Sequence, residues 1–396
     1  MTKSFMQGMS RASDLTRSGK LTEATALIQS LLSGNAEPAD PQHMAAGQVP
    51  LADKDVIEGT FSPVDEKAPK SAAPPSSKPT KRAARPGKSL SETLRTIAAG
   101  GMPQTIKPAS APPDLPEGAK LLSLSHTNAQ GSRDYLLYVP AKTSARPMPL
   151  IVMLHGCTQT PQDFATGTNM NALAEDAGYL VAWPAQPQGA NAQKCWNWFR
   201  PEDQARDRGE PAVLAGIIRD ILRDHPVDAS RVYVAGLSAG GAAAAIMGAA
   251  YPDLIAAVGV HSGLPVGGAQ DVMSAFSAMR SGSPGKAQAK AIPTIVLHGL
   301  ADSTVHPSNG TAVIAQATKS CKGLKRVQGS GATDAGRSYR HTRHEDMAGR
   351  SFAEHWEIDG AGHAWSGGRP GGSYTDPTGP DASREMLRFF AQHRRT

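Results

Sequence analysis

The sequence is poor in cysteine, in aromatic residues and in long apolar runs. Its 396 residues contain only three cysteines, an odd number that is too small for a disulfide framework. No CxxC or His-rich pair has the spacing of metal ligands, so we expect no metal and no other cofactor. The net charge is +6, but the one short basic cluster, residues 78–88, has no aromatic residue among its charges. This argues against a nucleic-acid partner.

Long apolar segments are missing as well. No run approaches the 18 apolar residues that a transmembrane helix needs, so no membrane span is predicted. The first 20 residues have no apolar core after their first lysine, so no Sec signal peptide is visible. We therefore expect a cytoplasmic protein, with export by another route as the alternative.

Composition divides the chain into three parts. Residues 3–17 and 21–33 carry short apolar stripes separated by "RSGK", which predicts a helical hairpin at 1–35. Residues 36–118 are rich in Pro, Ala, Ser and Lys. They cannot bury enough apolar surface to offset chain entropy, so we expect a disordered linker. Apolar periodicity begins near residue 120 and predicts a folded domain at 119–396.

Apolar strands alternate with helices throughout this domain. Strand patterns lie at 132–141, 149–156, 179–184, 231–236, 254–263 and 292–299, and helix patterns at 168–178, 212–225, 241–250 and 382–393. Most of these strands are apolar throughout, which indicates burial on both faces. The pattern therefore predicts an α/β fold with a mostly parallel sheet and helices on both faces. In such sheets the chemistry gathers at the carboxyl ends of the strands.

The segment "VYVAGLSAGG" (232–241) places one serine where an apolar strand runs into an alanine-rich helix. Strand and helix nearly touch at such a corner, so the positions two residues before and after the serine must be small. Gly236 and Gly240 meet this demand. The strained corner would lift the Ser238 hydroxyl clear of the sheet, beside the positive end of the helix dipole. Ser238 is the predicted nucleophile, and a purely structural tight turn is the alternative.

A serine nucleophile needs a base, and the base must be oriented by an acid. In this architecture the order along the chain is serine, acid, histidine. Asp302 is the only acid immediately after the strand at 292–299. In the segment "WEIDGAGHAWSGG" (356–368) a further strand is followed by a glycine-rich loop that carries His363. We predict Asp302 as the acid and His363 as the base. Asp359, on the same loop as His363, is the rival acid.

The chain has twelve histidines, and other roles are expected for the rivals. His155 and His298 end strands, where a structural hydrogen bond is favoured. His261 follows its own strand, and at most it is expected to contact the catalytic residues without contacting the substrate. His341 and His344 are placed in a polar loop.

Acyl transfer also needs N–H donors aimed at the developing oxyanion. The backbone N–H of Ala239, directly after the nucleophile, is one candidate. The second is the backbone N–H of Cys157, in the loop after the strand at 149–156. Cys157 is also a rival nucleophile, but no base is placed for it.

Five segments together resemble the polyhydroxybutyrate (PHB) depolymerase family of esterases, namely "LIVMLHGCTQTPQDFA", "NAQKCWNWF", "VYVAGLSAGGAAA", "HGLADSTVHP" and "GAGHAWSGG". These α/β-hydrolases are similar to feruloyl and acetylxylan esterases. The resemblance covers about 120–394 and omits the first 118 residues. It implies an α/β-hydrolase fold and the same site assignments: Ser238, Asp302 and His363 for catalysis, and Cys157 and Ala239 for the oxyanion hole.

The resemblance also implies that Cys157 and Cys195 are neighbours, because their counterparts in secreted relatives look like a disulfide pair. A reducing cytosol disfavours the bond itself, so we expect proximity and leave the bond open. Four aromatic residues are expected either to pack in the core or to form an apolar wall for the substrate: Trp196, Trp198, Phe199 and Trp365.

The sequence thus predicts a serine esterase for short-chain 3-hydroxyalkanoate-type esters, acting through an acyl-enzyme on Ser238. A feruloyl or acetylxylan ester is the alternative substrate, although no carbohydrate-binding module is visible. A non-catalytic polyester-granule binder, attached through residues 1–35 and the basic linker, is the alternative of another class. The intact set of Ser, Asp and His argues against that binder.

Overall fold

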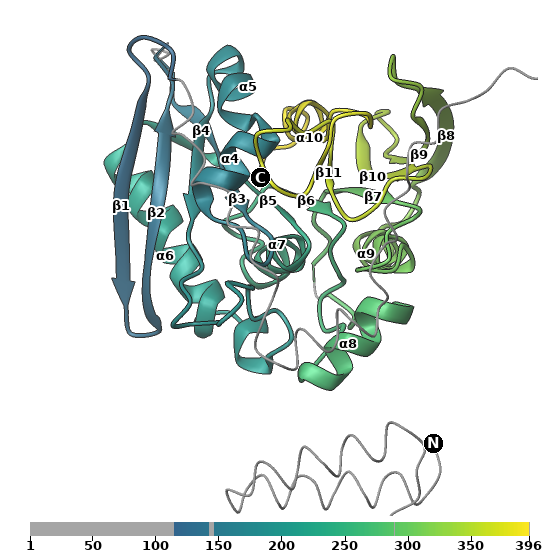
Figure 1. Ribbon diagram of the computed structural model, residues 1–396, viewed down its shortest axis with the longest axis horizontal. Coiled ribbons are helices and arrows are strands. Elements are labelled where there is room, and N and C mark those ends of the chain that lie inside the picture. Colours follow the sequence, from purple (N-terminus) through teal and green to yellow (C-terminus); the bar gives the residue numbers. More distant parts are fainter. Residues whose placement is uncertain (1–114, 142–145, 289, 396) are drawn as a thin grey trace, which may run out of the picture. The chain divides into compact units, whose positions relative to one another are not determined.

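The computed structural model describes residues 115–141, 146–288 and 290–395 (Figure 1). The predicted helical hairpin at 1–35 lies outside these residues, as does nearly all of the predicted linker at 36–118. Strand β1 begins at Lys120, close to the expected start of the folded domain.

A ten-stranded sheet lies at the centre of this domain, in the order β1-β2-β4-β3-β5-β6-β7-β10-β9-β8. The strands are β1 Lys120–Asn128, β2 Gly131–Val139, β3 Met148–Leu154, β4 Leu180–Pro184, β5 Val227–Leu237, β6 Ala257–His261, β7 Thr294–Gly299, β8 Lys325–Ala332, β9 Ser338–Glu345 and β10 Ser351–Ile358. The neighbours from β4 to β10 run parallel. The strands at both edges pair antiparallel.

Helices cover both faces of the sheet (Figure 1). They are α4 Pro161–Thr168, α5 Met170–Ala177, α6 Gly209–Asp224, α7 Ala239–Ala250, α8 Val272–Ser281, α9 Ser308–Thr318 and α10 Ala382–Phe390. Side chains of α6, α7 and α9 belong to one hydrophobic core, and those of α4, α5 and α10 to a second. A mostly parallel sheet between two helical layers confirms the predicted α/β-hydrolase fold.

The buried half of strand β5, residues 232–237, shows why its sequence is apolar without a break. Val232 and Val234 belong to the first core, whereas Tyr233 and Ala235 belong to the second. Because successive side chains of a strand point to opposite faces, a strand between two cores needs apolar residues at every position.

The sequence did not predict every strand near the two edges of the sheet. No strand was predicted at the position of β1. His341 and His344 were predicted to lie in a polar loop, and this was wrong, because both lie on strand β9. β9 carries polar and charged residues along both faces, so its sequence lacks the apolar alternation that indicates a strand. It is held instead by its pairing with β8 and β10.

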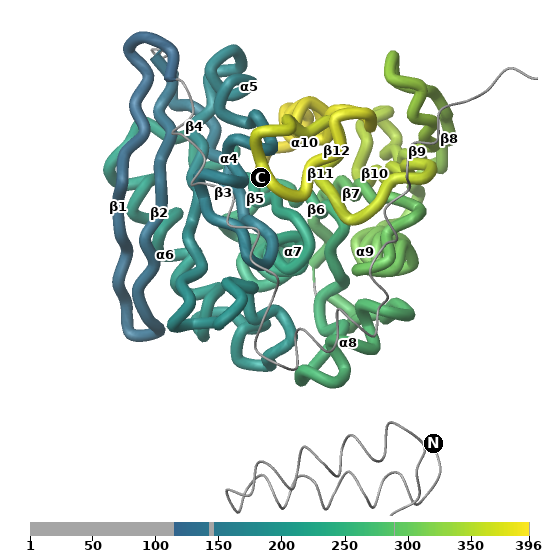
Figure 2. Tube along the Cα trace, viewed as in Figure 1, coloured from purple at the N-terminus to yellow at the C-terminus, as the bar shows by residue number. Residues whose placement is uncertain are grey.

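After β10 the chain returns across the domain (Figure 2). It forms a short parallel pair, β11 Trp365–Ser366 and β12 Thr375–Asp376, and then enters α10. No helix among the described residues is long and apolar enough to cross a bilayer.

The packing of α10 gives a first prediction. Phe390 is fully buried, and its ring stacks on that of Tyr233 with centroids 4.8 Å apart. Phe390→Ala should lower the free energy of unfolding by about 3–5 kcal/mol, because it leaves a cavity in the second core. Urea denaturation measures this loss. Phe276→Ala on α8, where the side chain is 38% exposed, is the matched control and should cost about 1 kcal/mol or less.

Candidate active site

The corner between β5 and α7 has the geometry of a nucleophile elbow. Ser238 joins the two elements with φ 59° and ψ −119°, a backbone region that costs energy for any residue with a side chain. A Cβ on Gly236 would lie 2.4 Å from the backbone of Gly240, and one on Gly240 would lie 2.0 Å from the carbonyl oxygen of Leu154. Glycine at both positions is therefore a steric requirement of the turn.

The predicted acid and base lie at the same edge of the sheet as Ser238. Ser238 directly follows β5, Asp302 follows β7 and His363 follows β10. Strands β5, β6, β7 and β10 are parallel neighbours, so their carboxyl ends meet at one edge. The N–H of Ala301 donates to the carbonyl of Ala361 over 2.9 Å, which ties the acid loop to the histidine loop.

Asp302 and His363 are directly hydrogen-bonded. Nδ1 of His363 donates to Oδ2 of Asp302 over 2.8 Å, while Oδ1 accepts from the N–H groups of Thr304 and Val305, each at 2.9 Å. Burial raises the pKa of the Asp302 carboxyl, but the neighbouring His298, His363 and the Val305 N–H outweigh it and hold this pKa well below its usual range. The charged carboxylate fixes the His363 tautomer and leaves Nε2 to act as a base.

The hydrogen bond between nucleophile and base, which would complete a catalytic triad, is not formed in the structure. Among the described residues, no hydrogen bond joins the Ser238 hydroxyl to the ring of His363, whose ring bonds to Asp302. In free enzymes this bond is often long, and it tightens when substrate binds. Asp359, the rival acid, is exposed on the surface, so the structure pairs His363 with Asp302.

Two backbone donors are available beside the nucleophile. Within the described residues, neither the N–H of Ala239 nor that of Cys157 has a hydrogen-bond partner. Ala239 is the first residue of α7, where backbone N–H groups have no partner within the helix. The corner also packs the start of α7 against the end of β3, just before Cys157. Both predicted oxyanion donors are therefore free to bind a ligand.

Buried neutral histidines support this edge. His261 accepts from the N–H of Ser366 at Nε2, over 3.0 Å, and its backbone carbonyl accepts from the N–H of Ser238. Burial lowers the pKa of His261 to about 3, and the nearby His298 and His363 contribute to this shift to a smaller degree. His155 accepts from the N–H of Gln186, and burial lowers its pKa to about 4. Both rings thus have structural hydrogen bonds.

Comparison with known proteins identifies the family to which the chain belongs. The family described as esterase PHB depolymerase matches residues 133–345, more than half of the chain. The chain belongs to the PHB depolymerase family of esterases. The matched span includes Ser238 and Asp302, and His363 lies beyond its end.

Relatives of this PHB depolymerase family chain include a depolymerase and a feruloyl esterase. It is 32% identical over 250 residues to "Poly(3-hydroxyalkanoate) depolymerase C" of Paucimonas lemoignei, covering 59% of this chain and 58% of that protein. It is 33% identical over 140 residues to "Feruloyl esterase B" of Thermothelomyces thermophilus, covering 35% and 47%. The chain thus spans about half the length of the curated relatives it matches.

A solved structure supports the fold. The acetyl xylan esterase from Aspergillus awamori matches with a TM-score of 0.54 and 19% identity, over 69% of this chain and 99% of that chain. At this identity the likeness concerns the fold alone.

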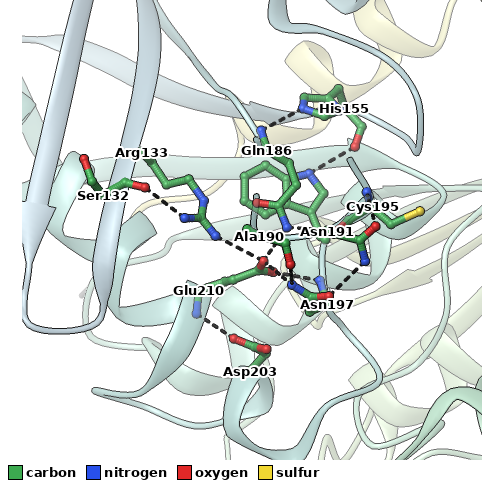
Figure 3. A network of polar contacts seen from close by, with 11 residues as sticks. Ser132, Arg133, His155, Gln186, Ala190, Asn191, Cys195, Asn197, Asp203 and Glu210 are labelled. Carbon is green, nitrogen blue, oxygen red and sulfur yellow. Dashed lines mark hydrogen bonds and ion pairs between the residues drawn. The ribbon is translucent and has the colours of Figure 1, made fainter. Parts of the chain in front are cut away.

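A buried carboxylate organises the loop that follows β4 in this PHB depolymerase family member (Figure 3). Glu210, in the first turn of α6, accepts from the backbone N–H of Asn197 at 2.8 Å, from the Asn197 side-chain amide at 2.8 Å, and from Arg133 and Gln186. Burial and the neighbouring Asp203 raise the pKa of Glu210. Sequence reasoning missed this residue. Its one signal was a carboxylate placed directly before an apolar helix.

The same loop carries Cys195, which the structure joins to Cys157 by a disulfide. Gln186 donates to the carbonyl of Cys195 over 2.8 Å, and the indole N–H of Trp196 donates to the carbonyl of His155 over 3.1 Å. The loop that carries the Cys157 N–H is therefore held by the disulfide, by this bond to His155, and by the N–H of Thr158, which donates to the carbonyl of Gln193 over 2.7 Å.

Three of the four predicted aromatic residues are buried, and the fourth is half-buried against the core. Trp196 and Trp365 are 0% and 1% exposed, so they pack in the core and have no free face for a substrate. The ring of Trp365 lies between Phe164 and His261. Trp198 is buried too, and only Phe199, at its edge, is half-buried. The substrate-wall prediction is therefore wrong for Trp196 and Trp365.

The described residues contain no group of three or more His, Cys, Asp or Glu side chains arranged to hold a metal ion.

The disulfide gives a prediction that thiol counting can check. Protein purified without reductant and then denatured should titrate one thiol, that of Cys321, and three after reduction. Three thiols before reduction would contradict the bond and would agree with the cytoplasmic location expected from the N-terminal sequence.

Proposed function

We propose that the protein is a serine esterase that hydrolyses short-chain 3-hydroxyalkanoate-type ester bonds. The observation that carries this proposal is the hydrogen bond between His363 and Asp302 at the edge of the sheet where the strained Ser238 corner lies. Membership of the PHB depolymerase family supports the same chemistry.

The mechanism follows from the positions of these groups. Nε2 of His363 takes the hydroxyl proton as Oγ of Ser238 attacks the ester carbonyl, and Asp302 stabilises the imidazolium that forms. The carbonyl oxygen becomes an oxyanion that accepts from the N–H groups of Cys157 and Ala239. His363 then protonates the leaving alkoxide, which departs as the alcohol. A water molecule, deprotonated by His363, releases the acid and restores Ser238.

The names of the relatives favour a hydroxyalkanoate ester, because the longest of the matches described above is to a poly(3-hydroxyalkanoate) depolymerase. A feruloyl or acetylxylan ester is the second candidate, favoured by a shorter match of similar identity. For a polymeric substrate, the proposed partner is the surface of a polyester granule. A rate comparison of 3-hydroxybutyrate trimer, methyl ferulate and acetylated xylan separates these substrate classes.

The role of Ser238 gives the central prediction. Purified protein should hydrolyse 4-nitrophenyl butyrate, and Ser238→Ala should lower kcat/KM by at least about 10³-fold, the scale expected on removing an activated nucleophile. The rate is followed from released 4-nitrophenolate.

Ser262→Ala is the matched control for this measurement. Ser262 follows the neighbouring strand β6 and also has a positive φ, 48°, but the hydrogen-bond partner of its hydroxyl among the described residues is the buried ring of His261. We expect a loss of a few-fold at most. An unchanged rate in Ser238→Ala would reject the nucleophile assignment.

A further inference from the structure

Tyr374 lies between the proposed base and the proposed oxyanion loop. Its ring meets that of His363 edge-on, with centroids 6.4 Å apart and an interplanar angle of 79°. Its hydroxyl lies 3.4 Å from Oγ1 of Thr158, the residue next to Cys157. Sequence reasoning did not select Tyr374, because it stands in a polar glycine-rich stretch, 216 residues along the chain from Thr158.

The backbone of Tyr374 is anchored although its side chain is 41% exposed. On one side, Ser373 donates from its N–H to Oδ1 of Asp163 over 2.9 Å, and from its hydroxyl to Oδ2. On the other side, the carbonyl of Tyr374 accepts from the N–H of Trp365 over 2.7 Å. Tyr374 also has a positive φ of 51°, which is costly for an aromatic residue unless its surroundings impose it.

One glutamine connects this anchor to the oxyanion loop. Oε1 of Gln159 accepts from the N–H of Gly156 over 2.8 Å. Its Nε2 donates to the carbonyl of Ser373 over 3.1 Å and to Asp163 over 3.0 Å. The loop that carries Cys157 and the loop that carries Tyr374 are thus fixed to the same side chain. An exposed aromatic ring held this firmly beside a reactive histidine is arranged for contact with a ligand.

The hydroxyl of Tyr374 is available to that ligand. A separation of 3.4 Å from Thr158 is long for an O–H···O hydrogen bond. Thr158 donates its own proton to the carbonyl of Cys157 over 2.6 Å. In the long contact with Thr158 the phenol is therefore the donor, and it can donate instead to a closer acceptor in the site.

We propose that Tyr374 determines specificity for the alcohol portion of the ester, an inference that rests on the proposed esterase function. His363 must protonate the leaving oxygen, so the alcohol portion of the ester lies beside His363. The Tyr374 ring, which meets His363 edge-on, is therefore next to this alcohol portion. When the leaving alcohol is itself a 3-hydroxyalkanoate, it carries a carboxylate or a further ester carbonyl. Either oxygen accepts the Tyr374 hydroxyl proton, whereas a simple alkyl alcohol offers no acceptor.

Two substrates with the same acyl group test this assignment. Methyl 3-hydroxybutyrate releases methanol, and the linear 3-hydroxybutyrate dimer releases a second 3-hydroxybutyrate. Tyr374→Phe should lower kcat/KM for the dimer by about tenfold, the effect of one hydrogen bond. It should change the value for the methyl ester less than about twofold. Tyr374→Ala should lower the dimer value further, because the ring contact is lost as well.

Tyr339→Phe, which removes a phenol hydroxyl on strand β9, is the matched control and should leave both values unchanged. Equal losses on both substrates, or no loss in either Tyr374 variant, would overturn the assignment while leaving the esterase function intact. Wild-type protein that hydrolyses neither ester would instead reject the proposed function, and this inference with it.

Discussion

The absence of a side chain at Gly240 is the constraint on which the site depends. A Cβ there would run into the carbonyl oxygens of Leu154 and His155, so α7 begins in direct contact with the end of β3. That contact brings two stretches of chain, more than 80 residues apart in the sequence, to one place. One carries Ser238 and the N–H of Ala239, and the other leads into the N–H of Cys157. The nucleophile and both proposed oxyanion donors follow from this one close approach.

The loop between β4 and α6 has little regular secondary structure, so it needs another source of rigidity. The buried carboxylate of Glu210 supplies it. A buried carboxylate without partners would cost several kcal/mol, and here the donors come from Arg133, Gln186 and Asn197. Because the Glu210 oxygens accept from donors on β2 and on the loop itself, the carboxylate holds these segments in one arrangement. The loop then presents Cys195 to Cys157 in a single position.

The central part of the fold could be predicted from the sequence, because strands between two apolar layers must be apolar throughout. The positions of Ser238 and Asp302 were predictable for the same reason, since each follows such a strand. His363 follows β10, which carries two glutamates and a histidine, so it was predicted from the chain order of serine, acid and histidine instead. The β8–β9 hairpin was not, because an edge strand with polar residues on both faces has no distinctive pattern. Trp365 was misread and Tyr374 missed for a further reason. Whether an aromatic residue in a glycine-rich loop is buried depends on contacts with Phe164 or Thr158, about 200 residues earlier.

The position of His363 after the last strand of the parallel sheet has a consequence for biosynthesis. Residues emerge from the ribosome in order, so Ser238 and Asp302 are made well before the histidine and before the loop fixed to Asp163. A nascent chain that stops short of β10 has the nucleophile and the acid, but it lacks the base that accepts the hydroxyl proton of Ser238. Only when the loop after β10 has been made, just before the chain crosses back over the sheet through β11 and β12 to α10 (Figure 2), does the newly made polypeptide acquire its proton acceptor.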